Sequence, residues 1–149
     1  AQWDRLLIRR GLVGIERALK SDKVPGPYLL QAMIAACHAR ATSTEQTDWP
    51  LIAELYAQLA VVMPSPVVEL NRAVAVAMAQ GPERGLELVD ALAGESVLEN
   101  YHLLPSVRGD LLRRLGRVEE ARAEFERAAA LAQNAREKSL LLRRAADCA

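Results

Sequence analysis

Aromatic side chains are scarce in this sequence. They make up 4% of the 149 residues, and only one of them is a phenylalanine. Aromatic and β-branched residues are enriched in strands, whereas alanine, which is abundant here, is the strongest helix former and is depleted in strands. The composition therefore favours closely packed helices and argues against a β-sandwich.

Cysteine and an excess of charge are also lacking. Two cysteines, Cys37 and Cys148, are too few for a disulfide framework, which indicates a reducing compartment. The 19 Lys and Arg residues balance 19 Asp and Glu residues, which argues against a domain that binds nucleic acid over its whole surface. No apolar run approaches the roughly 20 residues of a membrane-spanning helix. We therefore expect a cytoplasmic protein with no membrane partner.

The remaining composition is that of a folded domain. Apolar residues make up 51% of the chain and charged residues 26%, so a core can form and disorder is excluded as the main state. The first residues, AQWDRLL, contain neither an initiator methionine nor a signal peptide. We expect a single domain, 1–149, that is a fragment of a longer protein.

The run LNRAVAVAMAQ, residues 70–80, alternates alanine with larger apolar residues, which suggests a strand at first sight. Alternation indicates a strand only when the two sets differ in polarity, and here both are apolar. Helical spacing instead produces one apolar stripe: Leu70, Ala73, Val74 and Ala77. Ser65 can accept a hydrogen bond from the first turn, where Pro66 is also tolerated. We predict a helix that is apolar nearly all round and packs on more than one side.

Eight helices are predicted along the chain, and no segment has the pattern of a strand. Their expected ranges are 2–20, 27–41, 48–63, 66–80, 82–93, 99–115, 117–132 and 135 to the end. Gly81 and Gly116 follow two of them, and Gly116 suits the left-handed position after a helix. The short connections predict antiparallel hairpins at about 27–63, 66–93 and 99–132. The first and last helices would then cap the stack.

A repeated spacing supports these hairpins. In VRGDLLRRLGRVEEARAEFERAAA, residues 107–130, Gly109 is followed three residues later by Leu112, and Ala121 is followed four residues later by Phe125. This is the tetratricopeptide spacing with one conservative replacement. Two helices cross closely only where small side chains meet, so Gly109 and Ala121 are the expected crossing positions. Leu112 and Phe125 would fill the space beside the crossing.

The same spacing occurs 36 residues earlier, where Ala73, Val76, Gly85 and Val89 take the four positions. The gap between the two small residues is 12 in both copies. A weaker third copy would pair Ala36 with Ala53, but its loop is about five residues too long. Together these copies predict an all-α, right-handed α-solenoid of tetratricopeptide type.

No set of residues suited to catalysis or metal binding emerges. Zinc needs three or four ligands at suitable spacing, and the sequence supplies only His38, His102 and the neighbouring Cys37. Seryl nucleophile motifs, glycine-rich phosphate loops and metalloprotease signatures are absent. We therefore expect no enzymatic activity, no metal and no cofactor. The acidic residues of the seventh helix are expected to form a solvated face with pairs such as Glu119–Arg122.

A groove is the more promising site. In tetratricopeptide stacks the first helix of each hairpin lines the concave side. That geometry places six side chains in the groove: Asn71, Val74, Met78, Ser106, Asp110 and Arg113. The Asn71 amide could bind the backbone of an extended peptide, or it could bond to a neighbouring helix end. The candidate partner-binding residues are Asn71, Asp110, Arg113 and Arg114.

Two basic clusters stand out in the second half of the chain. Their members are Arg108, Arg113, Arg114 and Arg117, then Arg136, Lys138, Arg143 and Arg144. No aromatic residues are interleaved for base stacking, so a solubilising or protein-contacting surface is favoured over nucleic-acid binding.

Four runs of this sequence resemble a known family. They are GPYLLQAMIAACHA, DWPLIAELY, SPVVELNRAVAVA and YHLLPSVRGDLLRRLGR. They look like the C-terminal tetratricopeptide-like extension of a bacterial group of extracytoplasmic-function (ECF) RNA polymerase sigma factors, and the resemblance covers essentially the whole chain. It implies a cytoplasmic transcription regulator that contacts the sigma core, RNA polymerase or another protein. The promoter-binding regions of such a parent are missing here, so this domain should not bind promoter DNA by itself.

Two other functions remain open at this point. The domain could be a free-standing tetratricopeptide adaptor for a peptide of an unrelated partner. It could also be an enzyme or ligand-binding domain within a helical shell, which a deep polar pocket with clustered titratable groups would favour. A helix-turn-helix encoded upstream of Ala1 would separate the sigma-factor interpretation from the adaptor.

Overall fold

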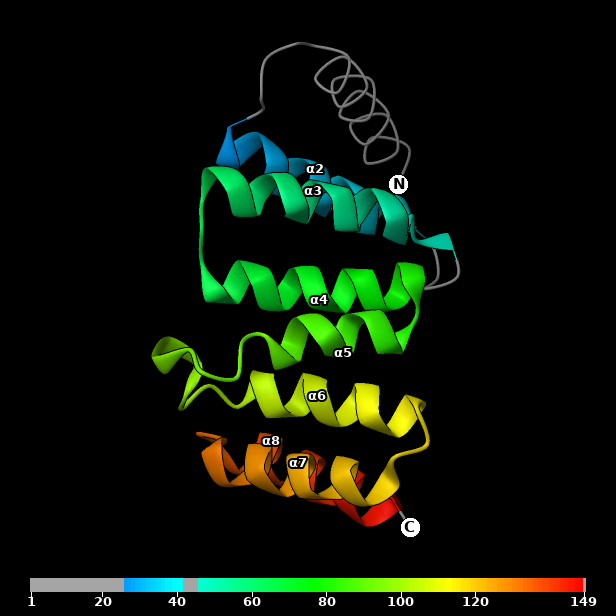
Figure 1. Ribbon diagram of the computed structural model, residues 1–149, viewed down its shortest axis with the longest axis vertical. Helices are drawn as coiled ribbons and strands as arrows, with labels where there is room; N and C mark the ends of the chain where they lie inside the picture. Colours follow the sequence, from blue (N-terminus) through cyan, green and yellow to red (C-terminus); the bar gives the residue numbers. More distant parts are fainter. Residues whose placement is uncertain (1–25, 42–45, 149) are drawn as a thin grey trace.

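The computed structural model describes residues 26–41 and 46–148. The first expected helix, 2–20, lies outside this part of the chain. The described residues form seven α-helices and one short 3₁₀-helix, and none of them is in a strand. Figure 1 shows the helices arranged as successive rungs along the long axis of the molecule.

The helices follow one another in the expected order. Their bounds are α2 (Pro27–Arg40), α3 (Trp49–Val62), α4 (Pro66–Gln80), α5 (Pro82–Asp90), η2 (Ser96–Leu98), α6 (Leu103–Arg114), α7 (Val118–Leu131) and α8 (Ala135–Asp147). Each α-helix packs chiefly on its neighbours in the sequence. The hairpins α2–α3, α4–α5 and α6–α7 therefore form a stack, and α8 packs on α7. This confirms the expected all-α solenoid of helical hairpins.

The helices begin where the sequence indicates. A proline occupies the first turn of α2, α3, α4 and α5, where its missing N–H is not needed. The Asp48 carboxylate accepts a hydrogen bond from the Leu51 N–H at 3.2 Å, and the Ser65 hydroxyl accepts one from the Val67 N–H at 3.2 Å. Both side chains therefore cap a helix start.

Two glycines make the turns inside the hairpins. Gly116 follows α6 with φ of 80°, the left-handed conformation expected for it. Its N–H bonds to the Arg113 carbonyl, and the next N–H, of Arg117, bonds to the Leu112 carbonyl at 2.9 Å. This pair of bonds satisfies carbonyls at the helix end. Gly81, with φ of 106° and ψ of 158°, joins α4 directly to α5 in a conformation essentially restricted to glycine.

One helix end differs from the expected range. We expected the fifth helix to reach residue 93, but α5 ends at Asp90. Beyond Asp90 the chain changes to a tighter turn, in which the Leu92 N–H donates to the Val89 carbonyl three residues back. Three-residue winding places Leu92 over Val89, and both side chains are buried.

The start of the sixth helix also differs. We expected it at about residue 99, but α6 begins at Leu103. Pro105 explains the difference. Its ring would clash with the carbonyl of Tyr101 if the helix continued backwards. Starting at Leu103 places the proline in the first turn, where it is tolerated. The preceding chain forms η2, which buries Leu98.

Helix α4 lies between two apolar clusters, as its all-round apolar sequence predicts. Leu70, Ala73 and Ala77 belong to the cluster that α4 shares with α5, η2, α6, α7 and α8. Val68, Ala75 and Val76 belong to the cluster shared with α2 and α3. The alanines let helices approach α4 from both sides.

The small residues of the two repeats lie at helix crossings. A Cβ added at Gly85 would come within 3.0 Å of the Ala73 carbonyl oxygen on α4. A Cβ added at Gly109 would come within 3.1 Å of the Phe125 ring on α7. Ala121 and Phe125 are fully buried. In the repeat at residues 107–130, the Phe125 ring therefore fills the space that Gly109 leaves open.

Candidate functional site

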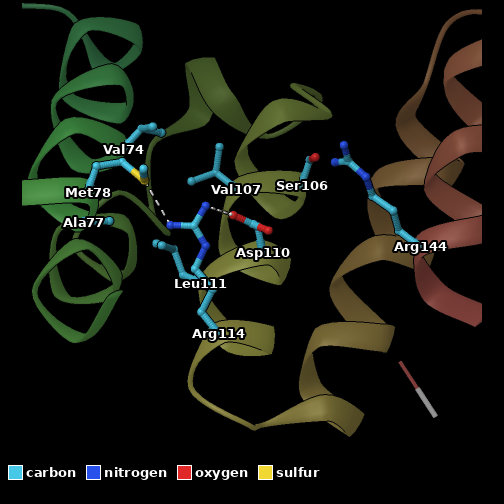
Figure 2. A pocket seen from close by; sticks show the side chains of 9 residues that line it. All are labelled: Val74, Ala77, Met78, Ser106, Val107, Asp110, Leu111, Arg114 and Arg144. Carbon is cyan, nitrogen blue, oxygen red and sulfur yellow. Dashed lines mark hydrogen bonds and ion pairs between the residues drawn. The ribbon is translucent and has the colours of Figure 1, made fainter. Parts of the chain in front are cut away.

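The described surface carries a hollow between helices α4, α6 and α8. Its volume is about 330 Å³, and Figure 2 shows its lining side chains. They are Val74, Ala77, Met78, Ser106, Val107, Asp110, Leu111, Arg114 and Arg144. These three helices are the first helices of successive hairpins, or occupy that position at the end of the stack. The hollow therefore lies on the face that the sequence analysis expected to be concave.

Helical spacing brings the polar side chains to this face. Ser106, Asp110 and Arg114 are four residues apart on α6, so they form one stripe along the helix. Val74 and Met78 form the corresponding stripe on α4. The buried residues Leu111 and Leu112 fix the rotation of α6 because they pack into the core. The stripe of Ser106, Asp110 and Arg114 therefore faces the hollow, with Leu111 at its inner edge.

Asp110 is the centre of the charge arrangement. One carboxylate oxygen lies 2.7 Å from Nη2 of Arg113, and the other lies 3.0 Å from Nη2 of Arg114. Arg114 also donates through Nη1 to the Met78 sulfur at 3.1 Å, which links α6 to α4. Figure 2 shows Arg114 extended between these two partners. A single carboxylate thus holds two guanidinium groups, that of Arg114 in the hollow and that of Arg113 outside its lining.

Arg144 enters the hollow from α8. Figure 2 shows its guanidinium group directed toward Ser106. Arg122 on α7 donates to the Cys148 carbonyl at 2.6 Å, which ties the end of α8 to α7, and the Cys148 thiol donates to the Arg144 carbonyl within the same segment. The expected Glu119–Arg122 pair is absent among the described ion pairs, because Arg122 reaches α8 instead.

The two basic clusters differ in how their charge is balanced. Each arginine of the first cluster has a carboxylate partner: Arg108 pairs with Asp90 and Glu124, Arg113 and Arg114 with Asp110, and Arg117 with Glu120. Within the described part of the chain, none of the basic residues on α8 has such a partner. They are Arg136, Lys138, Arg143 and Arg144, and all are exposed. The uncompensated positive charge therefore lies on α8.

The predicted groove residues separate into two sets. Val74, Met78, Ser106 and Asp110 meet in the hollow, together with Arg114. Arg113 pairs with Asp110 but lies outside the hollow lining. Asn71 is exposed and lines a second hollow of about 310 Å³ between α2, α3 and α4. Its lining also includes Gln31, Ile34, Ala35, Tyr56, Leu59, Met63 and Val68.

Arg144 was not among the predicted groove residues. It was predicted in a basic cluster, and its place in the hollow depends on how α8 packs. The i, i+4 spacing of Ser106, Asp110 and Arg114 was a readable signal that Arg114, rather than Arg113, shares the stripe. No described hydrogen bond joins the Asn71 amide to a helix end, so the amide stays available at the surface of its hollow.

Among the described residues, the histidines and cysteines belong to no metal-binding cluster. No group of three or more His, Cys, Asp or Glu side chains in residues 26–41 and 46–148 could hold a metal ion. His38 packs edge-on against Trp49 instead. Burial, reinforced by Asp48, raises the pKa of the Cys37 thiol above its ordinary value of 9.0. The thiol stays protonated at neutral pH and is therefore a poor nucleophile.

Comparison with known proteins supports the fold. The first TPR domain of the human RPAP3 protein, solved by NMR, superposes with a TM-score of 0.62. The match covers 83% of this chain and 94% of that domain, at 21% sequence identity. The fold is a tetratricopeptide-like α-solenoid.

A curated protein also matches in sequence. An uncharacterized protein of Rhizobium meliloti (strain 1021) is 50% identical over 139 residues, which is 93% of this chain. The chain spans only 32% of that protein's length. No protein-family profile matches the sequence. No helix in the described residues is long and apolar enough to cross a membrane.

Proposed function

We propose that this chain is the regulatory protein-interaction domain of a bacterial ECF RNA polymerase sigma factor. It would act in the cytoplasm, without catalysis, by binding the sigma core, RNA polymerase or a regulator through the face formed by α4, α6 and α8. The observation that carries the interaction role is the open hollow between these helices. Its side chains come from separate elements and combine apolar walls with charged groups, which is typical of a recognition site.

The solenoid fold supports a role in binding. Successive helical hairpins present an extended concave surface, because each repeat adds one helix to the same face. Here α4 contributes apolar side chains, α6 contributes a polar stripe, and α8 contributes a guanidinium group. The same surface would serve the alternative function, a free-standing adaptor.

One sequence observation favours a sigma-factor parent, and a second is consistent with a longer parent. The first is the resemblance of four runs spread from residue 26 to residue 117. The second is the Rhizobium meliloti relative, in which the matched region takes up 32% of the protein. That protein has enough further chain for additional domains, as the proposal requires of the parent of this domain.

Binding measurements test the proposal. The domain would be titrated against the protein segment that its gene is found to encode upstream of residue 1, proposed to be a sigma core, and against RNA polymerase. Ser106→Trp should weaken association, because the indole fills the hollow. Ser139→Trp, an exposed position on α8 outside the hollow lining, is the matched control. Circular dichroism would verify that both variants fold.

Three results would decide between the interpretations. Association that is lost in Ser106→Trp and kept in Ser139→Trp supports the proposal. Equal binding by both variants would exclude the hollow as the contact surface. A gene with no helix-turn-helix encoded upstream, together with no binding to polymerase, would overturn the sigma-factor assignment and favour the adaptor.

A further inference from the structure

We infer that the hollow between α4, α6 and α8 binds an extended acidic segment of a partner protein, with an Asp or Glu carboxylate on the Arg144 guanidinium group beside Ser106. This inference rests on the proposed use of the groove in binding. It adds the chemical class of the bound segment, which the fold alone does not specify.

The first argument for an acidic ligand is the balance of charge around the hollow. Two guanidinium groups, of Arg114 and Arg144, line the hollow together with the single carboxylate of Asp110. Asp110 pairs with Arg114, and with Arg113 outside the lining, whereas Arg144 has no carboxylate within ion-pair distance in the described chain. A guanidinium group carries five N–H donors, so Arg114 keeps donors free beside its bonds to Asp110 and Met78. The unmatched positive charge attracts an anionic group.

The geometry favours a carboxylate on a peptide. Arginine pairs with carboxylates through two parallel hydrogen bonds, and such pairs are stronger than neutral hydrogen bonds. Figure 2 shows the Arg144 guanidinium group directed toward the Ser106 side chain, where the hydroxyl can donate as well. Val74, Val107 and Leu111 line the same hollow. A carboxylate next to an apolar side chain would match both kinds of lining.

The second hollow provides room for the rest of the segment. Asn71 is three residues before Val74 on α4, which is a rise of about 4.5 Å along the helix. The amides of Asn71 and Gln31 each offer a donor and an acceptor at this second hollow. A peptide backbone has the same pair of groups, so an extended chain could continue from the charged hollow to these amides.

A peptide selection tests the inference without knowledge of the natural partner. Random 12-residue peptides, displayed on phage as N-terminal fusions and so without a free carboxyl end, would be selected on the immobilised 149-residue chain. We expect enriched sequences to carry Asp or Glu beside a large apolar residue. The best peptide would then be synthesised with an amidated end and titrated by fluorescence anisotropy.

Variants at the hollow should change affinity in opposite directions. Arg144→Gln should weaken binding about ten- to hundredfold, as expected for a lost charge-assisted hydrogen bond. Arg143→Gln has the same change in net charge, but this residue is outside the hollow lining, and it should stay within about twofold of wild type. Asp110→Asn should tighten binding, because it removes the carboxylate that competes with the ligand. If these residues had a purely structural role, Asp110→Asn would not increase the affinity for the peptide.

Each outcome bears on the inference. Acidic enrichment, loss in Arg144→Gln and gain in Asp110→Asn support it. Enriched peptides without acidic residues, equal effects of the two arginine variants, or no enrichment at all would overturn it. Acidic peptides that bind as expected, with no binding to the sigma core or polymerase, would leave this inference standing and reject the proposed function alone.

Discussion

Replacing Gly85 with alanine sets two opposing effects against each other. Alanine in a helix interior is normally favoured over glycine by about 0.5–1 kcal/mol. At Gly85, however, the added Cβ would lie 3.0 Å from the Ala73 carbonyl oxygen, 3.1 Å from the Ala77 Cα and closer still to the Ala77 Cβ. None of these atoms belongs to a side chain that can rotate away. The clash can therefore be relieved only if α4 and α5 move apart.

The expected loss of stability is the difference between the cost of the clash and the gain in helix propensity. Overpacking of a closely packed core typically costs about 1–3 kcal/mol. Because the contacts are with backbone and Cβ atoms, we expect the upper part of that range, less the gain in helix propensity. The net loss of stability should be about 1–2 kcal/mol. For a domain of this size it lowers the melting temperature by about 2–8 °C.

Thermal unfolding followed by circular dichroism measures this effect. Gly94→Ala is the control, because its added Cβ has no neighbour within 4 Å, and we expect a change within about 0.5 kcal/mol. The double variant Gly85→Ala, Ala77→Gly should be more stable than the sum of the single effects predicts, since it removes one of the clashing atoms. A Gly85→Ala protein that melts at or above the wild-type temperature would refute the close crossing of α4 and α5.

Three further predictions concern single side chains. Ala121→Leu should lower stability by about 1–3 kcal/mol or more in a thermal melt, because Ala121 is fully buried in α7; an unchanged midpoint would mean that this hairpin is misassigned. Asn134→Ala should cost about 1 kcal/mol in urea unfolding, because the side-chain amide oxygen of Asn134 caps α8 by accepting from the Glu137 N–H at 2.8 Å; an unaltered urea midpoint would show that the cap contributes nothing. The pKa of the Cys37 thiol is raised in the folded protein, so the folded state favours the protonated thiol. The resulting contribution to the free energy of unfolding is complete below the ordinary thiol pKa of 9.0 and is lost as the pH rises through the higher pKa of the folded state. The free energy of unfolding of Cys37→Ala, measured in urea titrations, should therefore fall less than that of wild type between pH 8 and about pH 11. An equal fall in both proteins would contradict this.

Local signals in the sequence were sufficient to predict most helix boundaries. Prolines at the starts of four helices, the Asp48 and Ser65 caps, and the glycines at 81 and 116 each act through the backbone of one turn. They could be read without knowledge of distant contacts. The two misplaced boundaries, at Asp90 and Leu103, lie in the segment between α5 and α6. There the burial of Leu92 and Leu98 in the shared core decides the path of the chain.

The repeat spacing also predicted which residues had to be small, because a helix crossing restricts side-chain size wherever it occurs. It did not predict which atom would occupy the space. Gly85 faces the backbone of α4, whereas Gly109 faces the ring of Phe125. The same spacing is thus compatible with two different contacts, and only the packing of both helices distinguishes them.

The candidate site depended most on the tertiary structure. Neighbouring residues on a helix point about 100° apart, so the choice between Arg113 and Arg114 requires the rotation of α6, which its packing against α7 fixes. Arg144 follows Ser106 by 38 residues and lines the same hollow only because α8 packs at the end of the stack, held through Arg122 and Cys148. The sequence by itself determined the helices, their order and the solenoid, since those follow from local backbone preferences and apolar periodicity. The packing of α4, α6 and α8 decided which charged side chains share one surface, because that depends on contacts between residues far apart in the chain.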